Sequence, residues 1–145
     1  MNILVMNGPN LNMLGMREPD IYGHETLGDI EAQCCQLAAG HGMELDWFQS
    51  NLEGELIEKI QQSVGKVDWI IINAAGLTHT SVVLRDALSL FPGEVIEVHL
   101  SNVHSRESFR HVSLISAIAK GVIAGFGASS YYMAINAIPN LHSET

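Results

Sequence analysis

Short apolar runs and longer amphipathic segments succeed one another along the whole chain. The run at residues 69–72 (WIII) contains no polar position, which is typical of a strand buried on both faces of a parallel sheet. An upstream segment instead carries apolar residues at helical spacing, at Leu27, Ile30, Cys34 and Leu37. That spacing predicts one buried helix face. Thr26 and Asp29 stand at the start of this segment with the spacing of a capping box, which predicts where the helix begins.

The same patterns predict the elements of the whole chain. Strands are expected at residues 2–6, 44–49, 69–72, 95–99 and 121–126. Helices are expected at residues 26–40, 52–64, 81–90 and 128–138, with Leu56, Ile60 and Val64 on the buried face of the second. Residues 100–119 show no clear period, so we expect a loop followed by a short helix. From Pro139 onward we expect a frayed tail, at about residues 139–145.

Strands that alternate with helices predict a parallel sheet with helices on both faces. The expected fold class is α/β: a flavodoxin-like three-layer sandwich with a five-stranded parallel sheet in the order 2-1-3-4-5. The chain has 145 residues, and we expect a single domain over residues 1–145. Strands 1, 3 and 4 are neighbours in this order. The polar segments that follow them should therefore meet at one edge of the sheet, where ligands bind in such folds.

Charge and cysteine content narrow the classes of partner. The net charge of −9 argues against binding to nucleic acid, because phosphate backbones need a basic surface. No apolar run is long enough to span a bilayer, so no membrane partner is expected. The cysteines, Cys34 and Cys35, are adjacent on a predicted helix, where an intrachain disulfide is not expected. Two reduced thiols predict a cytoplasmic protein.

The segment at residues 7–23, NGPNLNMLGMREPDIYG, follows the first predicted strand and combines bending residues with polar ones. A loop of this length in a compact domain is typical of a lid or a binding loop, and we place a lid at about residues 15–24. Arg17 and Tyr22 both lie in it. An arginine near a phenol favours the phenolate, which can act as a base. The alternative is a surface loop with a half-buried aromatic residue.

Glu97 and His99 lie two positions apart in the fourth predicted strand, so their side chains point to the same face. A glutamate beside a histidine orients the ring and favours the protonated form that a general acid requires. The alternative is a simple ion pair at the end of a strand. Two such side chains in a central apolar strand are costly to bury, so both interpretations stay open.

Further candidates follow the third and fourth strands. Asn73 and His79 flank a turn of small residues, where a ligand can approach the backbone, although Asn73 is equally typical of a turn. Ser101 follows His99 and can bind a carboxylate. Arg106 and Arg110 add positive potential that suits a small anionic substrate, or else belong to a solvated basic loop.

Two other classes of function stay open on the residues alone. His79, His99 and His104 are candidate ligands of a three-histidine zinc site, although the chain has no HExxH pair. The glycine-rich segments match neither GxGxxG nor the P-loop pattern, so no nucleotide cofactor is expected. The fold class by itself also fits a non-catalytic binding module.

Four segments together resemble the type II 3-dehydroquinate dehydratases. They are the segment at residues 7–23, QSNLEGELI at 49–57, INAAGLTHTSVVLRDAL at 72–88 and VIEVHLSNVHSRESFRHVS at 95–113. The resemblance implies a single catalytic domain that converts 3-dehydroquinate into 3-dehydroshikimate, in the shikimate route to aromatic amino acids. It also implies catalysis without a metal or an organic cofactor, and a homododecamer built as a tetramer of trimers.

The resemblance also implies roles for individual residues. Tyr22 is the base that removes a proton from the carbon beside the ketone, and Arg17 keeps it ionised. Asn10 helps to hold a water that stabilises the enolate. His99, positioned by Glu97, protonates the departing hydroxyl.

The remaining implied roles concern substrate binding. Ser101 and the Leu100 amide hold the substrate carboxylate. Asn73, His79 and Arg110 bind the ring hydroxyls. Arg106 belongs to the closing lid, and Asp86 reaches in from a neighbouring subunit.

Overall fold

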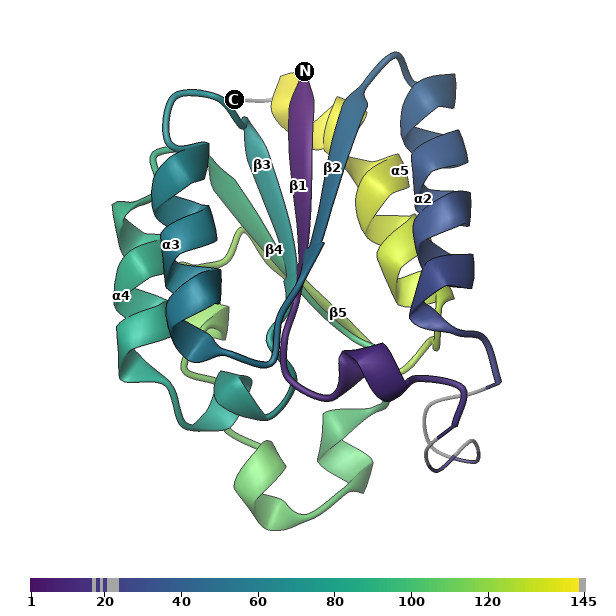
Figure 1. Cartoon of the computed structure of the whole chain (residues 1–145), viewed down its shortest axis with the longest axis vertical. Helices are drawn as coiled ribbons and strands as arrows, with labels where there is room; N and C mark the ends of the chain where they lie inside the picture. The colour runs from purple at the N-terminus through teal and green to yellow at the C-terminus, as the bar shows by residue number, and fades with distance from the viewer. Residues whose placement is uncertain (17, 19, 21–23, 144–145) are drawn as a thin grey trace.

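The computed structural model describes residues 1–16, 18, 20 and 24–143 (Figure 1). Arg17, Tyr22 and much of the expected lid therefore lie outside the described residues. The five strands are β1 (Asn2–Asn7), β2 (Glu44–Gln49), β3 (Trp69–Asn73), β4 (Glu94–His99) and β5 (Gly121–Ala124). They pair in parallel in the order β2-β1-β3-β4-β5, which confirms the predicted flavodoxin-like topology.

The helices cover both faces of this sheet (Figure 1). One layer consists of α2 (Leu27–Gly40) and α5 (Ser129–Ser143), and the other of α3 (Glu53–Ser63) and α4 (Val82–Leu90). The two hydrophobic cores divide the strands by alternate positions: Ile71 packs toward α2 and α5, whereas Ile70 and Ile72 pack toward α3 and α4. Burial on both faces is why the third strand is apolar at consecutive positions. None of the helices in the described part is long and apolar enough to cross a membrane.

The predicted start of α2 is confirmed in detail. The Thr26 hydroxyl accepts from the Asp29 main-chain N–H at 3.1 Å, and the Asp29 carboxylate accepts from the Thr26 N–H at the same distance. This reciprocal pair satisfies two N–H groups that the first helical turn leaves without partners. At the other end Ala38 is fully buried, whereas Leu37 is only half-buried.

Two predicted helix ends are wrong. Helix α3 ends at Ser63, and Val64, expected on its buried face, is 47% exposed because its backbone has already left the helix. Helix α5 continues through Pro139 to Ser143, so the frayed segment does not begin at Pro139. Packing holds this last turn, since Leu141 contacts the core and the Trp69 indole donates to His142 Nδ1 at 3.0 Å.

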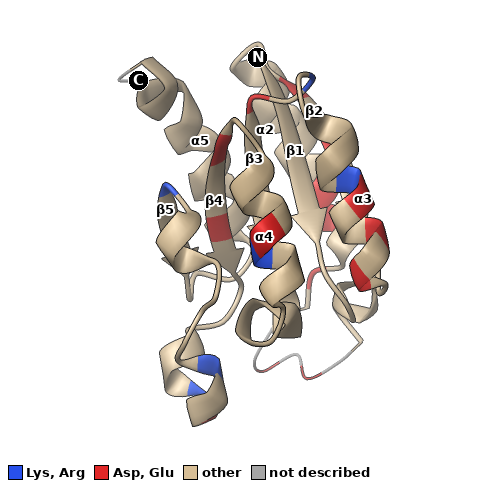
Figure 2. Cartoon of the chain, turned by 90° about the vertical axis from the view of Figure 1, so that its left-hand side faces the viewer, with Lys and Arg blue, Asp and Glu red and all other residues tan. Residues whose placement is uncertain are grey.

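The segment between β4 and β5 also differs from the expectation of a loop and one short helix. It forms three 3₁₀ helices: η3 (Val103–Ser105), η4 (Ser108–Arg110) and η5 (Ser116–Ile118). Two more 3₁₀ helices follow β1 and β3, namely η1 (Leu11–Met13) and η2 (Ala75–His79). The basic residues of the segment after β4 lie beyond the strand ends, whereas α3 carries most of its charge as acid (Figure 2).

Candidate active site

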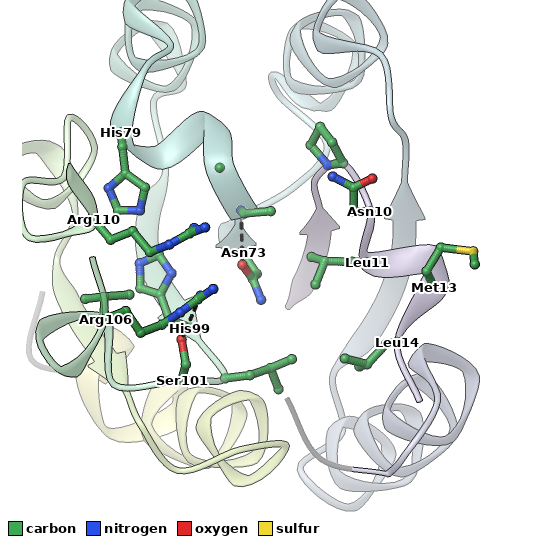
Figure 3. A pocket seen from close by; sticks show the side chains of 15 residues that line it. Asn10, Leu11, Met13, Leu14, Asn73, His79, His99, Ser101, Arg106 and Arg110 are labelled. Carbon is green, nitrogen blue, oxygen red and sulfur yellow. Dashed lines mark hydrogen bonds between the residues drawn. The ribbon is translucent and has the colours of Figure 1, made fainter. Parts of the chain in front are cut away.

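A pocket of about 140 Å³ opens at the carboxyl ends of β1, β3 and β4, at the predicted edge of the sheet. Its lining comes from the segments that follow these strands: Pro9, Asn10, Leu11, Met13, Leu14, Asn73, Ala75, Gly76, His79, His99, Leu100, Ser101, Val103, Arg106 and Arg110. Figure 3 shows the histidines and arginines grouped on one side, the residues after β1 on the other, and Asn73 between them.

The register of the strands brings these segments together. Asn7 and Asn73 are aligned partners at the ends of β1 and β3. Directly after β1, Gly8 passes so close to the main chain of Ala74 that an added Cβ would lie 2.5 Å from its carbonyl oxygen. Only glycine fits there, and the two loops that frame the pocket meet at this point.

Glu97 and His99 form a buried pair, as the spacing predicts. They are 2% and 5% exposed, and His99 Nε2 lies 2.5 Å from Glu97 Oε2. Ser113 and Ser116 donate to the other oxygen, Oε1, at 3.0 and 2.7 Å. Burial by itself raises the pKa of Glu97. The hydrogen bonds from His99, Ser116 and Ser113, together with the charge of His99, outweigh burial and lower this pKa below its ordinary value. These bonds therefore favour the carboxylate form of Glu97.

His79 stands next to this pair. Its Nδ1 donates to the Val112 carbonyl oxygen at 2.8 Å. Its ring is stacked on the His99 ring, with 6.5 Å between the centroids and 18° between the planes. Since Nδ1 of His79 is held by the main chain, Nε2 is the nitrogen that is left to meet a ligand.

Asn73 joins a buried hydrogen-bond network beneath the pocket. Its Nδ2 donates to the Tyr131 hydroxyl at 3.0 Å, and that hydroxyl donates to Asn7 Oδ1 at 2.7 Å. Its Oδ1 accepts from the Ala75 N–H at 3.1 Å. The turn-forming interpretation of Asn73 is confirmed by its bond to Ala75, and the same residue lines the pocket.

Arg106 and Arg110 bring positive charge to the pocket. Arg106 Nη1 donates to the Ser101 hydroxyl at 3.4 Å, and Arg110 Nε donates to Glu107 Oε1 at 3.1 Å. Glu107 is largely exposed, and its pKa is lowered by a backbone hydrogen bond and then by its bond to Arg110. Glu107 therefore pairs with both arginines on this side of the pocket.

The remaining predicted residues fall in different places. Leu100 and Ser101 line the pocket, as does Asn10, whose N–H donates to the Asn51 side chain at 2.9 Å. Asp86 lies on the exposed face of α4, outside the set of described residues that line the pocket.

The three-histidine zinc site does not form. The His104 ring lies beside the His111 ring, with centroids 5.7 Å apart, and not beside His79 and His99. Across residues 1–16, 18, 20 and 24–143, no three histidine, cysteine, aspartate or glutamate side chains converge in a way that could hold a metal ion.

Comparison with known proteins agrees with this geometry. The sequence profile of the family described as Dehydroquinase class II matches residues 1–139. The chain belongs to this family. It is 52% identical over 138 residues to a 3-dehydroquinate dehydratase from Synechococcus sp. (strain CC9605), covering 95% of this chain and 94% of the relative. It is 54% identical over 142 residues to 3-dehydroquinate dehydratase 2 of Pseudomonas putida, covering 98% and 95%.

Solved structures show the same similarity. The type II dehydroquinase of Butyrivibrio crossotus DSM 2876 superposes with a TM-score of 0.93 at 42% identity, covering 96% of this chain and 97% of that one. The type II dehydroquinase of Propionibacterium acnes gives a TM-score of 0.92 at 37% identity, covering 96% of each chain.

Some residues that shape the site were not predicted. Ser113, Ser116 and Tyr131 contact Glu97 or Asn73 from distant parts of the chain, and no spacing rule identifies such partners. Glu107 could have been found, because it stands three positions before Arg110, a common spacing for an ion pair in a helical turn.

Proposed function

We propose that this chain eliminates water from 3-dehydroquinate to give 3-dehydroshikimate, through an enolate intermediate, in the shikimate pathway to aromatic amino acids. The observation that carries the proposal is the buried Glu97–His99 pair at the wall of a pocket that Arg106 and Arg110 also line. Its context is a chain that matches nearly the full length of relatives named for this reaction.

The base in this proposal is Tyr22, kept as a phenolate by Arg17. The proton on the carbon beside a ketone is acidic enough for a phenolate to remove it. The enolate that results needs electrostatic stabilisation, for which we propose a water held with the help of Asn10. These three assignments rest on the sequence motif at residues 7–23.

The acid is His99. The hydroxyl group leaves only if a proton is supplied to it. Because the Nε2–H group of His99 donates to the Glu97 carboxylate, Nδ1 is the ring nitrogen that supplies this proton. The carboxylate of Glu97 keeps the ring oriented and faces the positive charge of the protonated ring.

Substrate binding uses the rest of the pocket. Ser101 and the Leu100 amide are proposed to hold the substrate carboxylate, near the positive charge of Arg106 in the lid. Arg110 and His79 are proposed to bind ring hydroxyls. Asn73 is proposed to do the same, since its Nδ2 carries a second hydrogen besides the one that it gives to Tyr131.

The proposal also covers cofactors, assembly and cellular compartment. Tyr22 and His99 supply the base and the acid, so no cofactor is needed. We propose a homododecamer built from trimers, in which the exposed Asp86 of one chain completes the site of its neighbour. The free thiols of Cys34 and Cys35 support a reducing compartment, which we propose is the cytoplasm.

The first test is direct. We expect 3-dehydroquinate added to the purified protein to give the rising ultraviolet absorbance of the conjugated enone. The rise should be insensitive to a chelator and to borohydride, because the mechanism uses neither a metal nor a Schiff base. No rise from folded protein would overturn the proposed function.

Two variants test the assignments. We expect Tyr22→Phe and His99→Ala each to lower kcat by about a thousandfold, because each removes a proton-transfer group. His104→Ala, outside the set of described lining residues, is the control and should keep most of the activity. Thermal unfolding should show that all three variants are folded. Wild-type rates from either catalytic variant would remove its assigned role.

A further inference from the structure

Residues 112–116, between η4 and the start of η5, pass close to both histidines of the pocket. We refer to them as the 112–116 strap. His79 Nδ1 donates to the carbonyl oxygen of Val112, at the start of the strap. Ile115 is fully buried in the core beneath α3 and α4. The strap is therefore anchored in the core at one point and bonded to His79 at another.

The two serines of the strap reach the second histidine through Glu97. Ser113 Oγ and Ser116 Oγ lie 3.0 and 2.7 Å from Glu97 Oε1. The other oxygen of the carboxylate is bonded to His99 Nε2. Three side chains therefore converge on a carboxylate that is 2% exposed.

The other hydrogen bonds of Ser113 show that its hydroxyl is the donor in the bond to Glu97. Its Oγ accepts from the main-chain N–H groups of Ile115 and Ser116, each at 3.1 Å. A hydroxyl has two lone pairs and one hydrogen, so the hydrogen is left for Glu97. Both serines present a hydrogen to Oε1, and an ionised Glu97 offers Oε2 to the Nε2–H group of His99. The arrangement therefore fits the carboxylate, and it leaves the hydrogen of His99 on Nε2.

We propose that Ser113 and Ser116 are positioning residues for the dehydration: they fix the Glu97 carboxylate, which holds the His99 ring in the orientation in which Nδ1 faces the departing hydroxyl. Both serines lie outside the set of described residues that line the pocket, so they act through Glu97 and not on the substrate. The inference rests on the proposed function, in which His99 is the acid.

Other charged or titratable groups also face this pair. Within the described part of the chain they are His79, stacked on the His99 ring, and Arg106 and Arg110, which line the same pocket. All three, and the proposed base Tyr22, stay unchanged when a serine is replaced. A change in the pH profile of a serine variant therefore reports on the Glu97–His99 pair.

The test compares Ser113→Ala, Ser116→Ala and the double variant. We expect kcat for 3-dehydroquinate to fall about tenfold in each single variant and about a hundredfold in the double, because each loses a hydrogen bond to a charged group. KM should stay within about twofold, because substrate contacts are intact. The acidic limb of the kcat profile should move to higher pH, since Glu97 without its donors protonates more readily.

Matched variants separate positioning from support of the fold. Ser89→Ala removes an exposed hydroxyl on α4 that bonds only a carbonyl of its own helix, and it should leave both kcat and the pH profile unchanged. Ser116→Thr keeps the hydroxyl and should keep most of kcat. In a Glu97→Gln background, removing the serines should cost little further, because the carboxylate on which they act is gone. An equal loss in both backgrounds, or a rise in KM at constant kcat, would overturn the proposal.

A readout that does not depend on turnover completes the design. At a pH where the His99 ring is neutral, nitrogen NMR of protein made with isotope-labelled histidine should show a single tautomer with the hydrogen on Nε2, and a mixture of tautomers in the double variant. Protein that forms no enone but shows this change would contradict the proposed function and keep the positioning role. A tautomer that is unchanged in the double variant would overturn the positioning role.

Discussion

The hydroxyl of Tyr131 lies between two asparagine side chains, accepting from Asn73 and donating to Asn7. Burial, partly offset by the bond from Asn73, raises the pKa of Tyr131 far above its ordinary value, so the group stays neutral and keeps the hydrogen that it donates. One buried hydroxyl therefore links the ends of β1 and β3, where the pocket begins.

We expect Tyr131→Phe to lower the free energy of unfolding by about 2 kcal/mol, because the Nδ2 donor of Asn73 and the Oδ1 acceptor of Asn7 both lose their bond to the buried hydroxyl. The loss should also lower kcat/KM, since Asn73 lines the pocket. Urea denaturation measures the first effect. Tyr132→Phe is the control on the same helix: this half-buried hydroxyl bonds Glu25 at 3.4 Å, and its loss should cost under about 0.5 kcal/mol. Equal costs for both variants would contradict the buried network.

The lowered pKa of Glu97 also predicts how stability changes with pH. A carboxyl whose pKa is lower in the folded state stabilises the fold above its ordinary value of 4.5, and this contribution is lost as the pH falls through the folded value. We expect Glu97→Gln to be less stable than wild type by about 3 kcal/mol at neutral pH, with the difference shrinking below about pH 4. Denaturation across this range measures it. A constant difference would mean that ionisation of Glu97 does not stabilise the fold.

Helix α5 shows where packing overrides local preference. Pro139 lacks the N–H that would bond the Ile135 carbonyl, yet the helix continues to Ser143 because Ile138 is buried and Leu141 contacts the core. We expect Pro139→Ala to raise the free energy of unfolding by about 1–2 kcal/mol, allowing for the gain in unfolded-chain entropy. Asn140→Ala, at the exposed neighbouring position, should change it by under about 0.5 kcal/mol. A destabilised Pro139→Ala would show that the proline is favourable there.

Elements with strong local signals could be predicted from the sequence. The Thr26–Asp29 capping box and the apolar run of β3 depend on neighbouring residues, so the sequence alone places them. Positions decided by distant contacts could not be placed. Val64 has helical spacing but leaves the helix, and residues 103–118 fold as three 3₁₀ turns around the buried Ile115.

In the site, too, features set by local sequence and strand order could be predicted, and features set by distant contacts could not. Its place could be predicted because parallel strands in the order 2-1-3-4-5 bring the ends of β1, β3 and β4 together, and Glu97 and His99 stand on that edge. The partners that set their chemistry, Ser113 and Ser116, lie 16 and 19 residues beyond Glu97. Contacts at such separations depend on the whole fold and leave no periodic signal.

The proposed assembly concerns the exposed surface of the chain. Large apolar side chains are exposed on several elements: Leu90 on α4, Phe109 on η4, and Val112 and Phe126 on loops. A subunit contact that covered these side chains would remove apolar surface from water. The proposed dodecamer would bury part of it and would bring Asp86 of one chain to the pocket of another. We expect sedimentation to show twelve chains, and a stable, fully active monomer would contradict the shared site.

Mixing two inactive variants tests whether the site is shared. Asp86→Ala lacks the group that is proposed to cross the interface, and His99→Ala lacks the acid, so each should be nearly inactive. When they are dissociated and reassembled together, sites with His99 from one chain and Asp86 from its neighbour become complete. A random mixture in equal amounts should then recover about a quarter of wild-type activity, because each site draws its two groups independently from the two variants. Glu58→Ala, an exposed acid on α3, is the control and should be fully active alone. If Asp86 acts within its own chain, every site in the mixture still lacks one of the two groups and no activity returns.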